Sequence, residues 1–143
     1  MYQRETLGLR EARTAVEAAL AEAGKEPDRP MVIAVVDDRG DLIYFARMDG
    51  ALPLFSKMAI NKAYTAALVQ RDTASFGDWL KEKNRDLAVW TDDKFTPVKG
   101  GVSIIKPGDG YLPIGTKRGA LYSAALVPVA VRGKKTSKSP LSP

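Results

Sequence analysis

The feature that most constrains this chain is an apolar run followed by a turn and a second strand-like segment. Residues 31–37 (Met-Val-Ile-Ala-Val-Val-Asp) are rich in β-branched side chains, and so short a run favours a buried strand over a helix. Residues 38–41 (Asp-Arg-Gly-Asp) have the composition of a tight turn, in which Gly40 can adopt a positive φ. Residues 42–47 then return as a second strand. The sequence therefore predicts a β-hairpin and, with it, an antiparallel sheet.

The returning strand is expected to place alternate side chains on opposite faces of the sheet. One face is expected to carry Leu42, Tyr44 and Ala46, and the other Ile43, Phe45 and Arg47.

Two more strands are expected later in the chain. Gly100 and Gly101 precede a strand-like apolar segment at 102–106, and residues 120–131 are again apolar, with a last part at 125–131 that is compatible with a strand. Pro128 lies within the last segment and predicts an edge strand, because proline has no N–H to donate to a neighbouring strand.

Three helices are expected around these strands. Apolar residues recur at helical spacing over 6–24, Pro53 fits the first turn of a helix over 53–69, and a shorter helix is expected over 72–83. The second helix has a face of small residues that could lie close against a sheet, formed by Ala59, Ala63, Ala66 and Ala67.

The order of these elements predicts an α/β sandwich with a mainly antiparallel sheet and helices packed on it. A length of 143 residues suits a single domain, which we expect to span residues 1–131. Residues 132–143 form a basic tail with the composition of a disordered segment. The tail holds four basic residues and no acidic one, which leaves +1 of the +5 net charge for the rest of the chain. A specific nucleic-acid partner is therefore not expected.

The chain has no cysteine and no histidine, which excludes several kinds of site. Disulfides, Cys-His and Ser-His-Asp triads and zinc clusters of the usual kind cannot form within it. The acidic turn with Asp37, Asp38 and Asp41 lacks an EF-hand pattern, so no metal site is predicted. No apolar run approaches the ~20 residues of a membrane helix, and no secretion signal is recognisable. We expect a cytoplasmic protein with no membrane partner.

Four motifs in fixed order resemble the GlcG/HbpS-like family of small haem-binding α/β proteins. They are residues 34–40 (Ala-Val-Val-Asp-Asp-Arg-Gly), 47–50 (Arg-Met-Asp-Gly), 62–67 (Lys-Ala-Tyr-Thr-Ala-Ala) and 100–102 (Gly-Gly-Val). The resemblance covers about residues 9–105. It implies a profilin-like fold with a sheet of about five strands, assembly into homo-oligomers, and haem as the candidate cofactor.

The resemblance weakens after about residue 105. The family continues into a glycine-rich strand and an acidic C-terminal helix, whereas this chain has residues 114–120 (Ile-Gly-Thr-Lys-Arg-Gly-Ala) and then the basic tail. A site built from that last strand is therefore not carried over to this sequence.

The motifs contain the candidate ligand-binding residues, which are Arg47, Asp49, Lys62, Tyr64, Thr65, Gly100 and Gly101. Each also has a structural interpretation. Arg47 and Asp49 could clamp a carboxylate or form an internal ion pair. Lys62 could bind an anion or lie over apolar surface. Tyr64 could ligate iron or pack in the core, and the glycine pair could approach a ligand or start a strand.

Two functions remain open, and a purely structural module is a third possibility. The first is a small-molecule-binding protein, with haem as first candidate on family grounds. Without histidine, iron would need Tyr, Met, Lys or Thr as ligand, or the porphyrin would be held by burial and contacts to its propionates. The second is an enzyme or accessory protein for a small organic acid or ring compound, using Lys, Tyr, Arg and Asp as acid-base groups. The sequence does not decide whether the chain is an enzyme.

Overall fold

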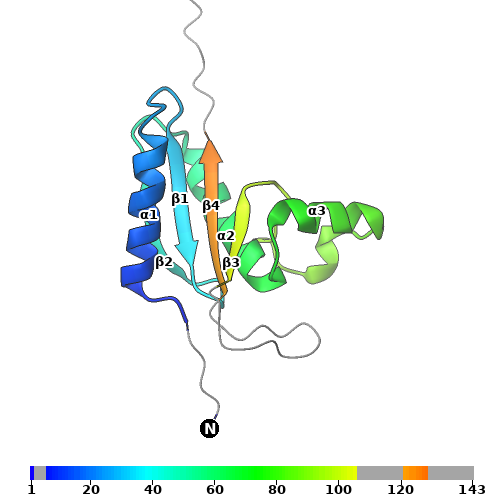
Figure 1. The fold of residues 1–143 in the computed structure, drawn as a ribbon. Coiled ribbons are helices and arrows are strands. Elements are labelled where there is room, and N and C mark those ends of the chain that lie inside the picture. Colours follow the sequence, from blue (N-terminus) through cyan, green and yellow to red (C-terminus); the bar gives the residue numbers. More distant parts are fainter. Residues whose placement is uncertain (2–5, 106–120, 129–143) are drawn as a thin grey trace, which may run out of the picture.

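The computed structural model describes residue 1, residues 6–105 and residues 121–128, and its centre is a four-stranded antiparallel sheet (Figure 1). The strands are β1 (Met31–Val36), β2 (Leu42–Arg47), β3 (Gly101–Ile105) and β4 (Leu121–Pro128), in the spatial order β2-β1-β4-β3. All three neighbouring pairs are antiparallel. The predicted hairpin and the mainly antiparallel sheet are confirmed.

Helices cover both faces of the sheet. Helix α1 (Leu9–Ala23) packs on β1 and β2, and α2 (Pro53–Val69) packs on β1, β3 and β4 from the other side (Figure 1). Helix α3 (Thr73–Glu82) lies next to β3 and is followed by the short 3-10 helix η1 (Leu87–Trp90). The result is a three-layer α/β sandwich whose two inner strands are β1 and β4.

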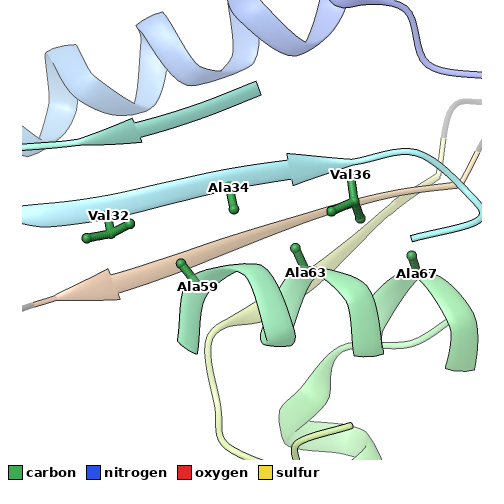
Figure 2. Packing of buried hydrophobic residues seen from close by; sticks show 6 residues of the cluster. All are labelled: Val32, Ala34, Val36, Ala59, Ala63 and Ala67. Atoms are coloured by element: carbon green, nitrogen blue, oxygen red, sulfur yellow. The ribbon is translucent and has the colours of Figure 1, made fainter. Parts of the chain in front are cut away.

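The core has one half on each side of β1, because the alternating side chains of a strand point to opposite faces. Towards α2, Val32, Ala34 and Val36 meet the alanines that recur every fourth residue of that helix, namely Ala59, Ala63 and Ala67 (Figure 2). Towards α1, the buried cluster consists of Ile33 and Val35 with Leu7, Ala12 and Val16. The expected small-residue face of α2 is confirmed, and short side chains let the helix backbone approach the sheet.

Strand β2 departs from the expected alternation. Val35 pairs with Tyr44, but Val36 pairs with Leu42, so a bulge leaves Ile43 as an extra residue. Leu42 therefore shares the α2 side with Phe45, and Ile43 packs towards α1. The prediction of strict alternation was wrong at Leu42 and Ile43, because a bulge changes the face of every residue beyond it.

The two edges of the sheet also differ from expectation. Strand β4 was expected at an edge but lies between β1 and β3, with Pro128 as its last residue opposite Met31. Proline at the end of an inner strand disturbs the sheet little, because the hydrogen bond that its missing N–H would make lies where the strand pairing ends. The edges are β2 and β3. The outer side of β3 is occupied by two side chains, because Gly101 donates its N–H to Thr73 Oγ1 at 2.9 Å and Ser103 donates its N–H to Asp72 Oδ1 at 2.8 Å.

The remaining expectations concern the helices and the ends of the chain. Helix α1 begins at Leu9, inside the expected range of 6–24, and the Leu9 side chain is 61% exposed. Asp72 precedes α3 as predicted, but its carboxylate accepts the N–H of Ser103 in β3 and does not cap the helix. The described residues form four strands, so the fifth strand and the profilin-like class stay predictions. The basic tail at 132–143 and the divergent segment at 114–120 lie outside the described residues. Among the residues described, no helix is both long and apolar enough to cross a membrane.

Candidate functional site

Helix α2 carries three of the candidate residues and directs them to different surroundings. Lys62 lies on the flank next to β3, where a side chain at position 101 would come within 2.5 Å of the Lys62 carbonyl oxygen. Tyr64 packs against the hairpin turn, since a Cβ at Gly40 would lie 2.5 Å from its ring. Thr65 is fully buried beneath the segment that follows η1.

Tyr64 is engaged through its hydroxyl. The Oη donates a hydrogen bond to Asp92 Oδ2 at 2.5 Å, and the ring packs against Phe95 with centroids 5.8 Å apart. The hydrogen bond to Asp92, followed by burial and by the nearby carboxylates, raises the pKa of Tyr64 to about 12. The same bond is the main cause that lowers the pKa of Asp92. Iron ligation by a Tyr64 phenolate would require the loss of this bond and of a strongly held proton.

Thr65 connects α2 to the loop that follows η1. Its hydroxyl donates to the carbonyl of Asn61 at 2.8 Å and accepts the N–H of Thr96 at 3.0 Å. Because both bonds are internal to the protein and the residue has no exposed surface, the hydroxyl fixes the loop in place.

Close packing explains why position 101 holds a glycine. A Cβ at Gly101 would lie 2.5 Å from the Lys62 carbonyl oxygen and 2.6 Å from the methyl group of Thr73. The Gly101 N–H is donated to Thr73, as described above, so this amide is already paired. Gly100 has a φ of +121°, a conformation that favours glycine.

Lys62 is the unusual member of the set. Its side chain is only 5% exposed, and within the described part of the chain it has neither an ion pair nor a hydrogen bond. Burial, which disfavours the charged form, lowers the pKa of Lys62. Two hydroxyls, those of Ser56 and Ser103, are also buried and have no hydrogen-bond partner among the described residues.

Arg47 and Asp49 lie away from this group. Both are exposed, and no salt bridge joins them. Arg47 ends β2, whereas Gly101 begins β3, and these strands form opposite edges of the sheet. The structure thus brings Lys62, Thr65 and Gly101 together around α2 and β3, with Arg47 and Asp49 at a distance from them.

Sequence reasoning missed the partners of these residues. Asp92 and Thr96 fall in an irregular segment without periodicity, and Thr73 looked like an ordinary helix start. An aromatic cluster fills the same region and is formed by Tyr64, Phe76, Trp79, Trp90 and Phe95. The cluster holds α3 and η1 together, and both tryptophans are half-buried in it.

A cleft of about 520 Å³ lies between α3, η1 and the loop before β3. Its apolar part includes Leu80, Leu87 and Val98, and its charged rim includes Lys81 and Arg85. None of the seven candidate residues lines this cleft. Nor do the described residues contain a group of three or more acidic side chains able to hold a metal ion.

Comparison with known sequences identifies relatives of the chain. The family model described as "Haem degrading protein HbpS-like" matches residues 7–116. Protein GlcG of Escherichia coli (strain K12) is 33% identical over 95 residues, which cover 66% of this chain and 69% of GlcG.

Two solved structures share the fold. A double mutant of HbpS from Streptomyces reticuli matches with a TM-score of 0.71 at 24% identity, covering 89% of this chain and 77% of the other. PduOC, solved as a complex with haem, matches with a TM-score of 0.65 at 21% identity, covering 85% of this chain and 82% of the other. The resemblance seen in the four sequence motifs is confirmed. Since the family model matches more than half of its length, the chain belongs to the HbpS-like family.

Proposed function

We propose that this protein binds a small molecule and that haem is the first ligand to test. The observation that carries the proposal is the shared fold with PduOC, whose solved structure is a haem complex. Membership of a family described as haem-degrading supports the same ligand.

The residues of this chain fit the carboxylates of haem better than its iron. The chain has no histidine or cysteine, the Tyr64 hydroxyl donates a hydrogen bond to Asp92, and the sulfur of Met48 accepts one from the N–H of Met31 at 3.3 Å. Lys62 has no ion pair among the described residues and suits a propionate, whereas Arg47 lies at the opposite edge of the sheet. Haem would supply its own redox chemistry when bound, while the protein would bind and orient the ring.

A haemin titration tests the proposal. We expect a saturable, shifted Soret band at a stoichiometry of one haemin per chain, because a specific site saturates and non-specific adsorption does not. The heat-unfolded protein serves as the control. A response that never saturates, or that is equal for folded and unfolded protein, would sink the haem proposal.

A second candidate is an enzyme or accessory protein for a small organic acid or ring compound. The lowered pKa of Lys62 favours it, since burial makes the neutral amine, the form that can accept a proton, easier to reach. The test is hydrogen–deuterium exchange at carbon next to the carboxylate of small organic acids, followed by NMR. Exchange by the wild type that disappears in Lys62→Met would support an enzyme. Equal exchange in both proteins would exclude this role for Lys62.

A further inference from the structure

Among the side chains that the structure describes, the layer between α2 and the sheet is apolar, apart from three polar groups without partners. Its main contacts are between valines and alanines of β1 and α2 (Figure 2). Ser103 faces this layer, because it aligns through β4 with Val36. Ser56 lies three residues before Ala59 on α2 and shares its side of the helix. Both hydroxyls are buried and unpaired.

Lys62 is the third of these side chains. It follows Ala59 by three residues and precedes Ala66 by four, so it shares the side of α2 that contains these buried alanines. Its carbonyl lies against Gly101, which places the residue on the β3 side of the layer. A buried polar group without a partner costs free energy, and a buried charge costs more.

A purely structural role does not explain this placement. A lysine that only covers apolar surface keeps its ammonium group in water, as the exposed Lys57 can on the same helix. Lys62 is only 5% exposed as a residue, and within the described residues its amine has neither an acidic partner nor a hydrogen bond. Burial without compensation is the arrangement expected of a group that receives its partner from outside.

We propose that Lys62 is the anion anchor of this protein and that its amine binds the carboxylate of the small-molecule ligand at the junction of α2 and β3. This inference rests on the proposed function and deepens it, since it names the group that the ligand must carry. A carboxylate supplies the missing charge and hydrogen-bond acceptors, and the low polarity of the layer strengthens the pair. The carboxylate can be a haem propionate or that of a free organic acid.

The test compares haemin with haemin dimethyl ester, in which both carboxylates are blocked. Wild type is expected to bind haemin roughly tenfold or more tightly than the ester, since a hydrogen bond to a charged group is lost. Lys62→Met is expected to bind haemin as weakly as wild type binds the ester, and to show no preference between the two. Lys57→Met, on the exposed side of the same helix, is the matched control and should retain the preference. Thermal unfolding confirms that both variants are folded.

The outcomes separate the two claims. Saturable binding of haemin with no preference over the ester in wild type would overturn the anchor while the proposed function stands, and this comparison needs no variant. If wild type fails to bind haemin, the haem proposal falls, and the anchor is then tested with benzoate by NMR of isotopically methylated lysines. Benzoate should raise the pKa of Lys62 and leave that of Lys57 unchanged. An unchanged Lys62 pKa would overturn the anchor as well.

Discussion

The hydroxyl of Tyr64 shows how one residue can be removed from ligand chemistry by its neighbour. Its bond to Asp92 holds the proton on the tyrosine and the charge on the carboxylate. Folding therefore favours the protonated form of Tyr64. The resulting stability is fully present below pH 10.0, the ordinary pKa of tyrosine, and is lost as the pH rises to about 12.

Removal of the Asp92 carboxylate should free the Tyr64 hydroxyl from its hydrogen bond. In Asp92→Ala we expect the pKa of Tyr64 to fall from about 12 towards 10.0, because the main cause of the rise is gone. Tyrosinate absorbance against pH measures this change, with Tyr64→Phe identifying the step and Tyr44→Phe as the control. The same titration curve in Asp92→Ala and wild type would contradict the assignment. Tyr64→Phe should itself cost about 0.5 kcal/mol of stability, the lower end for a hydrogen bond, since the pair is partly solvated.

In the ligand-free protein, Lys62 should lower the free energy of unfolding. The folded state holds the Lys62 proton less tightly than the unfolded chain, so the penalty of the buried charge is fully present below the lowered pKa. The penalty is relieved as the pH rises from the lowered pKa to the ordinary value of 10.5.

Lys62→Met is therefore expected to be at least as stable as wild type at pH 7. Its advantage should shrink as the pH rises through 10.5, the ordinary pKa of lysine, because above that pH the lysine is neutral in both states. Urea unfolding at several pH values measures the difference, with Lys57→Met as the exposed control. A large loss of stability in Lys62→Met at pH 7 would show that the amine is satisfied in the free protein.

At the scale of elements, the contact of α2 with β3 depends on a missing side chain. Gly101 lets the strand approach the helix so closely that a methyl group would overlap the Lys62 carbonyl. The same approach places the Gly101 N–H on Thr73, so one glycine aligns β3 with both α2 and α3.

Gly101→Ala is expected to destabilise the protein by about 1 to 3 kcal/mol, the range for overpacking a close-packed contact. The backbone carbonyl at 2.5 Å cannot rotate away as a side chain could. Gly24→Ala is the control, because Gly24 has a φ of −65° that alanine adopts freely and lies at a helix end. Thermal unfolding of the two variants measures the difference, and equal melting temperatures would refute the packing argument.

At the scale of the whole molecule, the sheet is closed at one edge and open at the other. Asp72 and Thr73 occupy the outer N–H groups of β3, whereas within the described residues no strand pairs with the outer side of β2. On the α2 side of β2, Leu42 is 48% and Phe45 is 37% exposed. An open edge with apolar side chains is a surface that proteins usually cover.

The homo-oligomer expected from the family should therefore depend on β2. We predict that wild type sediments as an oligomer and that Phe45→Lys shifts it towards the mass of a single chain. Leu9→Lys replaces an apolar residue on α1 that is more exposed than Phe45, and it should leave the oligomer intact. Analytical ultracentrifugation decides between these outcomes. An oligomer that survives Phe45→Lys would place the interface elsewhere.

Several residues of the candidate site could be predicted from the sequence, but their arrangement in space could not. The motif at 62–67 correctly drew attention to Lys62, Tyr64 and Thr65, since polar residues in an alanine-rich helix are conspicuous. Whether each is free to bind depends on Asp92 and Thr96, which lie about 30 positions away in a segment with no pattern. The bulge in β2 and the central place of β4 were equally hidden, because pairing register is decided between strands.

By itself the sequence determined the local elements. Periodicity set the helices, β-branched runs and turn residues set the hairpin, and the absence of histidine and cysteine restricted the possible chemistry. Only the tertiary structure decided which polar groups are paired. The hydroxyls of Tyr64 and Thr65 are engaged in hydrogen bonds within the protein. Lys62 is a buried residue whose amine has no partner among the described residues. Such pairing depends on distances of about 3 Å between residues far apart in the chain, and those distances exist only once α2, β3 and the loop after η1 have packed together.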